Sequence, residues 1–226
     1  MSEFNIYCLP GNAATEHAGR FLQQMGIPVS FVPDAAATHW LLPVPTRIPV
    51  QVPEGVTVIG GNLESPGIDL LKDPFYLAEN AAITARCAMG LIGKDFRELS
   101  VLILGWGRIG KCLGRFLREA GAEVTIAVRK ESDVAMIRAL GYGSVRFHEV
   151  PPLLPQFGAI ANTVPAMVLA AAGCREDCVL LELASKPGIT GDKIIDGRGL
   201  PGRFAPEESG RLIARTVLRL CKEDGI

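Results

Sequence analysis

The 226-residue chain lacks any long uninterrupted apolar run, although 48% of its residues are hydrophobic. A helix that spans a bilayer needs about 20 consecutive apolar residues, so we expect no membrane-spanning helix. The first residues also lack a basic segment followed by an apolar core, and no secretory signal is expected. Charge of one sign is not in excess, since the formal net charge is −1. The sequence therefore gives no electrostatic reason to expect nucleic acid or an anionic membrane as a partner.

Histidine is scarce, and the three present are His17, His39 and His148. His17 and His39 have no cysteine or carboxylate at ligand spacing, which favours packed or surface side chains over catalytic ones. The six cysteines are scattered, and Cys174 and Cys178 have no second Cys/His pair beside them. We therefore expect no metal site, and free thiols in a reducing cytoplasm.

Glycine is abundant, and three glycines form a loop around which the chain is organised. An apolar run over 99–104 is typical of a strand buried on both faces, and it leads into the G-x-G-x-x-G spacing. The first glycine permits a tight turn, the second lets the backbone approach a pyrophosphate, and the third lets the next helix pack closely. The residues that we expect to bind the cofactor here are Gly105, Trp106, Gly107, Arg108, Ile109 and Gly110.

The residues after this loop complete the motif. An amphipathic helix is predicted up to Gly121, and residues 123–128 are predicted to form a second strand. Strand, glycines, amphipathic helix, glycine and strand within about 30 residues are the context that distinguishes a dinucleotide-binding βαβ unit from a chance match.

No acidic residue ends the second strand, where NAD-binding units usually have an Asp or Glu for the ribose 2′-OH. Arg129 and Lys130 follow that strand instead. Two cations are suited to a 2′-phosphate, and Arg129 could bind it through a bidentate fork. The pattern favours NADP(H) over NAD(H); the alternative is an ordinary solvated basic pair.

Residues 1–72 differ from the rest, because eight of the sixteen prolines lie in the first 70 positions. Short apolar runs and one helix over 15–25 predict a small N-terminal α/β domain with a β-α-β start. A linking helix over 73–95 begins at Asp73-Pro74, with an N-cap acid and a first-turn proline. Its polar residues either face an interdomain cleft or simply face solvent; they are Glu79, Asn80, Thr84 and Arg86.

Residues 96–204 are predicted to form the Rossmann-type, doubly wound parallel sheet of an α/β protein, followed by a C-terminal helix over 205–226. Further strands are predicted over 145–150, 159–165 and 178–183, and an irregular loop over 199–206. Ligands of such sheets bind outside the carboxyl ends of the strands. We therefore expect Asn162, Thr163 and Pro165 to line the path of the ribose and nicotinamide. Lys186, at the same edge, is either the catalytic cation that meets a substrate carboxylate or moves a proton, or a plain surface lysine.

Over roughly residues 74–221 the chain resembles the family of the dipicolinate synthase A subunits of spore-forming bacteria, which act in sporulation. The motifs that carry the resemblance are the glycine loop, Val128-Arg-Lys130, Asn162-Thr-Val-Pro165, Leu183-Ala-Ser-Lys-Pro-Gly188 and Gly199-Leu-Pro-Gly-Arg-Phe-Ala-Pro206. The resemblance implies an NADP-linked, pyridine-nucleotide-binding subunit. It also implies the conversion of a dihydrodipicolinate-type dicarboxylate to pyridine-2,6-dicarboxylate, together with a flavoprotein-like second subunit.

The sequence departs from the family pattern in three places. Its N-terminal domain is shortened, and the segment between Gly188 and Gly199 is shortened as well. The linking helix has Thr84-Ala-Arg86 where the family has a glutamate at the third position, which reverses a charge. Arg86 is therefore a second candidate for anchoring a substrate carboxylate.

Three functions are compatible with these residues. The first is an NADP-dependent oxidoreductase of this kind, acting on a dicarboxylate as a homo-oligomer. The second, a D-2-hydroxy-acid-type dehydrogenase, needs a histidine paired with a carboxylate. His148 and Glu149 are adjacent on a predicted strand and would point to opposite faces, which suits that role poorly. The third is a non-catalytic NADP(H)-sensing module, since no acid/base pair is evident.

Overall fold

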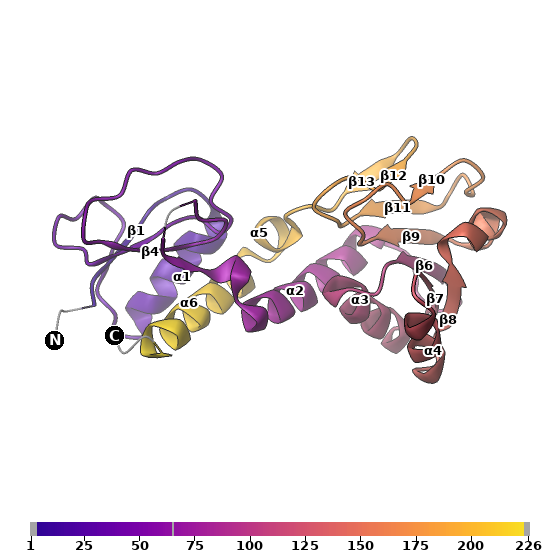
Figure 1. The fold of residues 1–226 in the computed structure, drawn as a ribbon, viewed down its shortest axis with the longest axis horizontal. Coiled ribbons are helices and arrows are strands. Elements are labelled where there is room, and N and C mark those ends of the chain that lie inside the picture. Colours follow the sequence, from indigo (N-terminus) through magenta and orange to yellow (C-terminus); the bar gives the residue numbers. More distant parts are fainter. Residues whose placement is uncertain (1–3, 65, 224–226) are drawn as a thin grey trace. The chain divides into compact units, whose positions relative to one another are not determined.

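The computed structural model describes residues 4–64 and 66–223 (Figure 1). The chain divides into two compact units. Unit 1 comprises Met1–Ile83 and Pro201–Ile226, and unit 2 comprises Thr84–Leu200. The chain therefore leaves unit 1, builds unit 2 from one continuous stretch, and returns. In the described residues no helix is long and apolar enough to cross a membrane.

Unit 1 contains a five-stranded parallel sheet of order β2-β1-β3-β4-β5. Its strands are β1 (Ile6–Cys8), β2 (Val29–Ser30), β3 (His39–Leu41), β4 (Thr57–Gly60) and β5 (Ile68–Asp69). Helix α1 (Ala13–Gln24) joins β1 to β2, and the Asn12 side chain caps it by accepting the Thr15 N–H at 2.8 Å. The predicted small N-terminal α/β layer with its β-α-β start is therefore present.

The C-terminal helix α6 (Pro206–Glu223) lies along α1 (Figure 1). Gly210 allows the close approach, because a Cβ there would lie 2.5 Å from His17 Cβ and 2.7 Å from Ala14 O. The apolar face of α6, including Leu212 and Val217, is buried. A layer too small for a core of its own is thus completed by a helix from the other end of the chain.

Helix α2 (Pro74–Ile92) begins where the Asp73-Pro74 signal predicts and ends three residues before the predicted bound at 95. A short 3-10 helix, η1 (Leu70–Lys72), precedes it, and the Asp73 carboxylate accepts the Tyr76 N–H at 2.7 Å. Gly93 follows with φ of 61°, the left-handed conformation that ends a helix without a Cβ penalty. The division between the units falls within α2, after Ile83.

Unit 2 contains a six-stranded parallel sheet of order β13-β11-β9-β6-β7-β8. Its strands are β6 (Ser100–Leu104), β7 (Glu123–Val128), β8 (Gly143–Arg146), β9 (Ala159–Asn162), β11 (Val179–Glu182) and β13 (Ile194–Asp196). Two further short strands, β10 (Leu169–Ala170) and β12 (Ile189–Thr190), pair with each other. This is the α/β Rossmann-type architecture that the sequence predicts.

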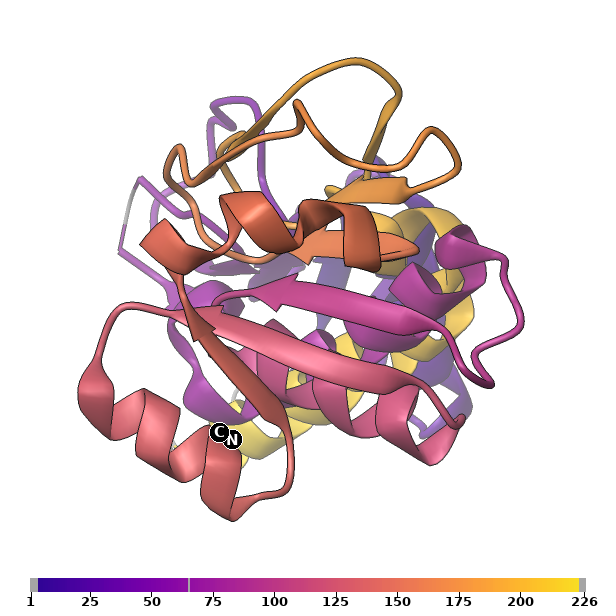
Figure 2. The same cartoon turned by 90° about the vertical axis from the view of Figure 1, so that its right-hand side faces the viewer.

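Successive side chains of the unit 2 strands point to opposite faces of the sheet, and both faces are covered. Ile103 packs with α3 (Arg108–Glu119) and α4 (Glu131–Ala139) on one face. Leu102 packs with the segment after β8 on the other. Figure 2 shows this arrangement, with the helices below the strands and the 3-10 segments above. Apolar runs without alternation are what such a sheet requires.

Three local predictions are wrong. The predicted strand over 159–165 ends at Asn162. The predicted strand over 145–150 ends at Arg146, and His148 lies on a 3-10 helix, η2 (Phe147–Glu149). The Glu149 side chain accepts the Arg146 N–H at 2.8 Å, and this local bond competes with strand pairing. A second 3-10 helix, η3 (Pro151–Gln156), follows. The segment over 199–206, predicted as an irregular loop, contains the short helix α5 (Leu200–Phe204).

Candidate dinucleotide-binding site

The glycine loop is shaped by two positions that tolerate no side chain. Gly105 follows β6 with φ of 100°, and a Cβ there would lie 2.6 Å from Val164 Cγ2 and 2.8 Å from Thr163 Oγ1. At Gly110 a Cβ would lie 2.4 Å from the Gly105 carbonyl oxygen. The first glycine therefore serves the turn, and the third lets α3 pack against the loop that precedes it.

Gly107 stands in open space. A Cβ there would meet no atom within 4 Å, and the residue is exposed. It is the N-cap of α3, and within residues 4–64 and 66–223 no side chain caps the N-terminus of that helix. A helix N-terminus whose N–H groups are free attracts anions through those donors and the helix dipole. The residues present therefore fit the pyrophosphate of a dinucleotide, which needs both the space and the donors.

The other residues of the loop differ in exposure. Trp106 is half-buried, with its ring edge-on to Tyr142 at 5.7 Å and the Lys111 ammonium 5.8 Å from its ring centroid. Ile109 packs on the core beside the helix, and Arg108 is exposed. Trp106 and Ile109 thus anchor the glycine loop on the core of unit 2, while Arg108 is exposed at the N-terminus of α3.

A cluster of basic side chains ends the neighbouring strands β7 and β8. Arg129 and Lys130 are exposed, and the Arg129 guanidinium lies 5.8 Å from the Phe147 ring centroid. Arg146, opposite Val128 in the register, donates to the Arg129 carbonyl at 3.3 Å and forms an ion pair with Glu131. Sequence reasoning missed Arg146 because only strand pairing, across 17 positions, brings it here.

Thr163 and Asn162 occupy the end of β9 in different ways. Thr163 is half-buried, and its hydroxyl donates to the Leu104 carbonyl at 2.8 Å beside the glycine loop. Asn162 is fully buried; its Oδ1 accepts the Val164 N–H at 3.0 Å, and its Nδ2 donates to Val164 O and Glu182 Oε1. Pro165 is exposed. Asn162 therefore shapes the loop after β9 from beneath, with its polar atoms already bonded.

Lys186 lies at the tip of the loop that follows β11, and its side chain is exposed. At the base of that loop is Glu182, a buried carboxylate that sequence reasoning did not single out. It lies inside the apolar run of a predicted strand, and a glutamate in such a run was the available signal. Arg86, the other candidate cation, is exposed and has its guanidinium 5.7 Å from the Phe116 ring centroid.

The histidines are distributed over both units. His39 is buried on β3, edge-on to the Phe4 ring at 4.6 Å. His148 is exposed, and within the described part of the chain it has no hydrogen bond to a carboxylate. Across residues 4–64 and 66–223, no group of three or more His, Cys, Asp or Glu side chains could hold a metal ion.

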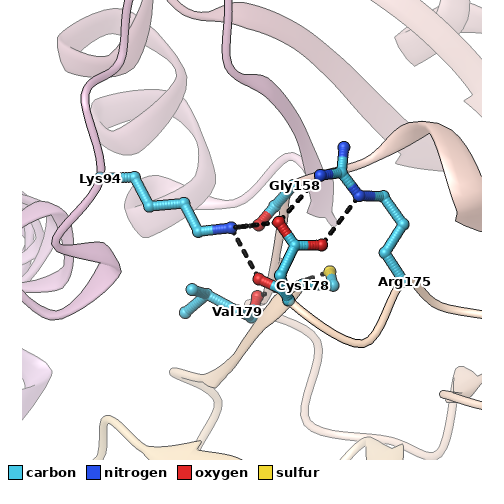
Figure 3. A network of polar contacts seen from close by, with 6 residues as sticks. Lys94, Gly158, Arg175, Cys178 and Val179 are labelled. Atoms are coloured by element: carbon cyan, nitrogen blue, oxygen red, sulfur yellow. Dashed lines mark hydrogen bonds and ion pairs between the residues drawn. The ribbon is translucent and has the colours of Figure 1, made fainter.

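The opposite edge of the sheet carries a structural network instead (Figure 3). Lys94 donates to the Gly158 carbonyl at 3.1 Å and the Asp177 carbonyl at 2.6 Å, just before β9 and β11 begin. Arg175 binds the Asp177 carboxylate at 2.9 and 2.8 Å. Burial raises the pKa of the adjacent Cys178 thiol to about 12, which keeps it protonated at neutral pH. This edge joins the segment after α2 to the sheet.

Unit 1 has a pocket of about 370 Å³ at the carboxyl ends of its strands β3 and β4. Its walls come from the loops that follow these two strands, with Leu42, Thr46 and Arg47 on one side and Asn62 and Glu64 on the other. Arg47 and Glu64 are both exposed, so the pocket carries one charge of each sign.

No family model matches the chain. The A subunit of dipicolinate synthase from Bacillus subtilis (strain 168) is 29% identical over 134 residues, a stretch that spans 54% of this chain and 45% of that protein. The crystal structure of the corresponding subunit from Bacillus halodurans has a TM-score of 0.80 and 21% identity, covering 96% of this chain and 97% of that one. The crystal structure of the Bacillus subtilis protein has a TM-score of 0.81 and 18% identity, covering 99% and 97%.

The matched sequence is thus less than half of the curated relative, whereas the matched fold is nearly complete in both structures. The resemblance that the motifs suggested is confirmed: the chain is similar to the A subunit of dipicolinate synthase in sequence over part of its length and in fold over nearly all of it.

Proposed function

We propose that this protein is an NADP(H)-dependent oxidoreductase, similar to the dipicolinate synthase A subunit, which acts on a dihydrodipicolinate-type dicarboxylate. The observation that carries the proposal is the open space over Gly107 at the uncapped N-terminus of α3. The exposed pair Arg129 and Lys130 follows the adjacent strand β7. Together they match the two anionic ends of NADP(H), its pyrophosphate and its 2′-phosphate.

The preference for NADP(H) is supported by the partner of Glu131. This carboxylate lies three residues beyond β7, where it could accept a ribose 2′-OH and would repel a 2′-phosphate. Arg146 forms an ion pair with it. Arg146 thereby neutralises Glu131 and leaves the charges of Arg129 and Lys130 available for a phosphate.

The proposed substrate site is the carboxyl edge of unit 2, where Thr163 and Lys186 follow β9 and β11. A dihydropyridine dicarboxylate loses one hydride and one proton when it becomes pyridine-2,6-dicarboxylate. Bound NADP⁺ would accept the hydride, and the proton would go to solvent. Lys186 would bind a substrate carboxylate and orient the ring, because its exposed ammonium is free to meet an anion. Thr163 shapes the floor between this site and the glycine loop through its bond to the Leu104 carbonyl.

Assembly as a homo-oligomer in the cytoplasm and a flavoprotein-like second subunit belong to the same proposal. The second subunit is supported by the likeness to a protein whose name makes it one component of dipicolinate synthase. Co-purification of the chain with such a partner, followed by size-exclusion chromatography with light scattering, tests the second subunit and the oligomeric state.

The experiment that tests the function is a calorimetric titration of the purified protein with NADPH and with NADH. A dihydrodipicolinate-type substrate and NADP⁺ are then added, with and without the second subunit, while NADPH absorbance is followed. Tighter NADPH binding and substrate-dependent NADPH formation support the proposal. Equal affinities for NADPH and NADH would contradict the assignment to NADP(H), and absence of any nucleotide binding would overturn the proposed function.

A second candidate is a non-catalytic module that senses NADP(H). The observation that favours it is the lack of an acid/base pair: Glu149 is engaged with the Arg146 N–H, and His148 beside it has no carboxylate partner in the described residues. The same observation weighs against a D-2-hydroxy-acid-type dehydrogenase. Tight NADPH binding without turnover of any dicarboxylate, with or without the second subunit, would favour the sensor.

A further inference from the structure

Glu182, the last residue of β11, carries a buried carboxylate whose four acceptor positions are filled. Only 4% of the residue is exposed. Its Oε1 accepts from Asn162 Nδ2 at 2.8 Å and from the Ala184 N–H at 3.0 Å. Its Oε2 accepts from the Gly188 N–H at 2.7 Å and the Ile189 N–H at 3.3 Å. A charge can be buried at this level only because such bonds replace its hydration.

Three of these four donors belong to a single loop, residues 183–189, which turns back over the end of its own strand. The base of the loop, at Ala184, Gly188 and Ile189, is buried, whereas Ser185, Lys186 and Pro187 at its tip are exposed. The carboxylate therefore holds both stems of the loop together and leaves the tip free to meet a ligand.

The fourth donor joins this loop to the one after β9. Asn162 Nδ2 bridges Glu182 and the Val164 carbonyl. Gly188 makes the junction possible, because a Cβ there would lie 2.3 Å from Asn162 Nδ2 and 2.5 Å from the Ala166 carbonyl. The positions of the two loops that border the carboxyl edge are thus coupled through one side chain.

The donors that surround this carboxylate show that it orders a loop rather than forming a salt bridge. Among the described residues, no basic side chain donates a hydrogen bond to Glu182, although Arg198 is near enough to interact with its charge; the four hydrogen bonds come from uncharged N–H groups. An apolar residue of similar volume would leave the Ala184, Gly188 and Ile189 N–H groups without this acceptor, at a cost in free energy. What an apolar residue could not do is bind three separate backbone N–H groups and so select one conformation of the loop.

We infer that Glu182 is a positioning residue that fixes the 183–189 loop so that Lys186 is presented for a substrate carboxylate. The inference rests on the proposed function, because that function gives Lys186 its ligand. It assigns to Glu182 no contact with substrate or cofactor. Loss of the carboxylate should therefore affect dicarboxylate binding through Lys186 and leave the pyrophosphate site over Gly107 intact.

The test uses the full chain with Glu182→Gln, in which one acceptor oxygen is replaced by an NH₂ group that faces N–H donors. Hydrogen exchange should become about tenfold faster at the Gly188 and Ile189 amides, which lose their acceptor. Pyridine-2,6-dicarboxylate, titrated into the NADP⁺ complex, should bind about tenfold more weakly. NADPH affinity should change by less than about threefold, since the glycine loop is untouched.

A double variant distinguishes positioning from general damage. If Glu182 acts through Lys186, Glu182→Gln should weaken dicarboxylate binding no further in a Lys186→Ala background, whereas independent effects would add. Leu181→Ala is the matched control: it removes a fully buried side chain from the same strand and should lower the melting temperature while retaining dicarboxylate affinity. Should Glu182→Gln not fold, Glu182→Asp keeps the charge but shortens the side chain, so that it no longer reaches all four donors, and should give the same changes in smaller measure.

Each failure has its own signature. Unchanged amide exchange, or additive losses in the double variant, would overturn the role of Glu182 even if NADPH binds. A wild-type protein that binds no NADPH would overturn the proposed function, whatever the loop does in the exchange experiment. Equal losses in Leu181→Ala and Glu182→Gln at equal melting temperature would show that the carboxylate acts only on stability.

Discussion

Unit 1 and unit 2 each end a parallel strand in a carboxylate that binds the backbone of a neighbouring loop. In unit 1, Asp69 at the end of β5 accepts N–H groups of Asn62, Leu63 and Leu71, at 3.2, 3.3 and 2.9 Å. Lys72 lies 3.6 Å from the same carboxylate. In unit 2, the four hydrogen bonds to the Glu182 carboxylate come from uncharged N–H groups. In both units, a carboxylate at the end of a strand therefore holds the loops at the carboxyl edge of the sheet. In the described residues a salt bridge to a lysine accompanies these bonds in unit 1, and no salt bridge accompanies them in unit 2.

The two units also differ in how their cores are assembled. Unit 2 is built from one continuous stretch, and its βαβ unit is legible in sequence order. Unit 1 needs α6 from the far end of the chain, which packs on α1 through Gly210. Substitutions at the site of unit 2 should therefore change ligand binding without unfolding, and substitutions at the junctions of unit 1 should change stability without changing ligand binding.

The largest effect is expected at Gly107. Gly107→Val places a branched side chain in the space proposed for the pyrophosphate, and NADPH affinity should fall by at least about 100-fold. Because a Cβ there meets no protein atom, the melting temperature should stay at the wild-type value. Calorimetric titration and thermal unfolding measure the two quantities; a folded variant that retains affinity would show that this loop is not the phosphate cradle.

The next effect sharpens the assignment of the cofactor. Arg129→Ala should weaken NADPH binding by about 1.5–3 kcal/mol, the loss of a charged hydrogen bond, and scarcely change NADH binding. Parallel titrations with both nucleotides give the difference. A loss of the same size for NADH would place Arg129 away from the 2′-phosphate.

Unit 1 should respond in stability alone. Asp73→Ala removes the N-cap of α2 and the 2.7 Å partner of Arg219, and should destabilise the protein by about 1–2 kcal/mol with unchanged NADPH affinity. Burial acts to raise the pKa of Asp73, but the Tyr76 N–H and the Arg219 guanidinium together outweigh it and hold that pKa below its ordinary value of 3.8.

This carboxylate also sets a pH dependence with a defined sign. A depressed pKa in the folded state stabilises the protein above pH 3.8, and that contribution is lost as the pH falls from there through the lowered pKa. Denaturant unfolding between pH 2 and pH 6 should therefore be less steeply pH-dependent in Asp73→Ala than in the wild type. Equal slopes would show that Asp73 contributes nothing to acid stability.

The smallest effect concerns the Arg146–Glu131 pair. Arg146→Ala frees the Glu131 carboxylate, and NADPH affinity should fall by about 1 kcal/mol, or roughly fivefold, as expected for an exposed pair. Adding Glu131→Ala should restore most of it, because the repelling charge is then gone. A double variant that remains as weak as Arg146→Ala would assign to Arg146 a direct contact instead.

Local patterns predicted the elements of unit 2 well because their causes are local. The run over 99–104, the glycine loop and the helical period after it specify β6, the turn and α3 within 20 residues. The Asp73-Pro74 signal likewise predicts where α2 begins. The prediction placed His148 on a strand. That strand ends earlier, at Arg146, whose N–H donates to the Glu149 side chain, and prolines follow in the next segment.

By itself the sequence determined the Rossmann-type unit, the nature of its glycine loop and the basic residues after β7, because spacing and side-chain type suffice for these. Only the tertiary structure decided which residues surround them. Arg146 reaches Glu131 through the pairing of β7 with β8, and Glu182 meets Asn162 through the pairing of β11 with β9. Unit 1 likewise obtains its last helix from more than 180 residues away, by packing of α6 on α1. Such contacts depend on strand order and helix packing, which no local period encodes.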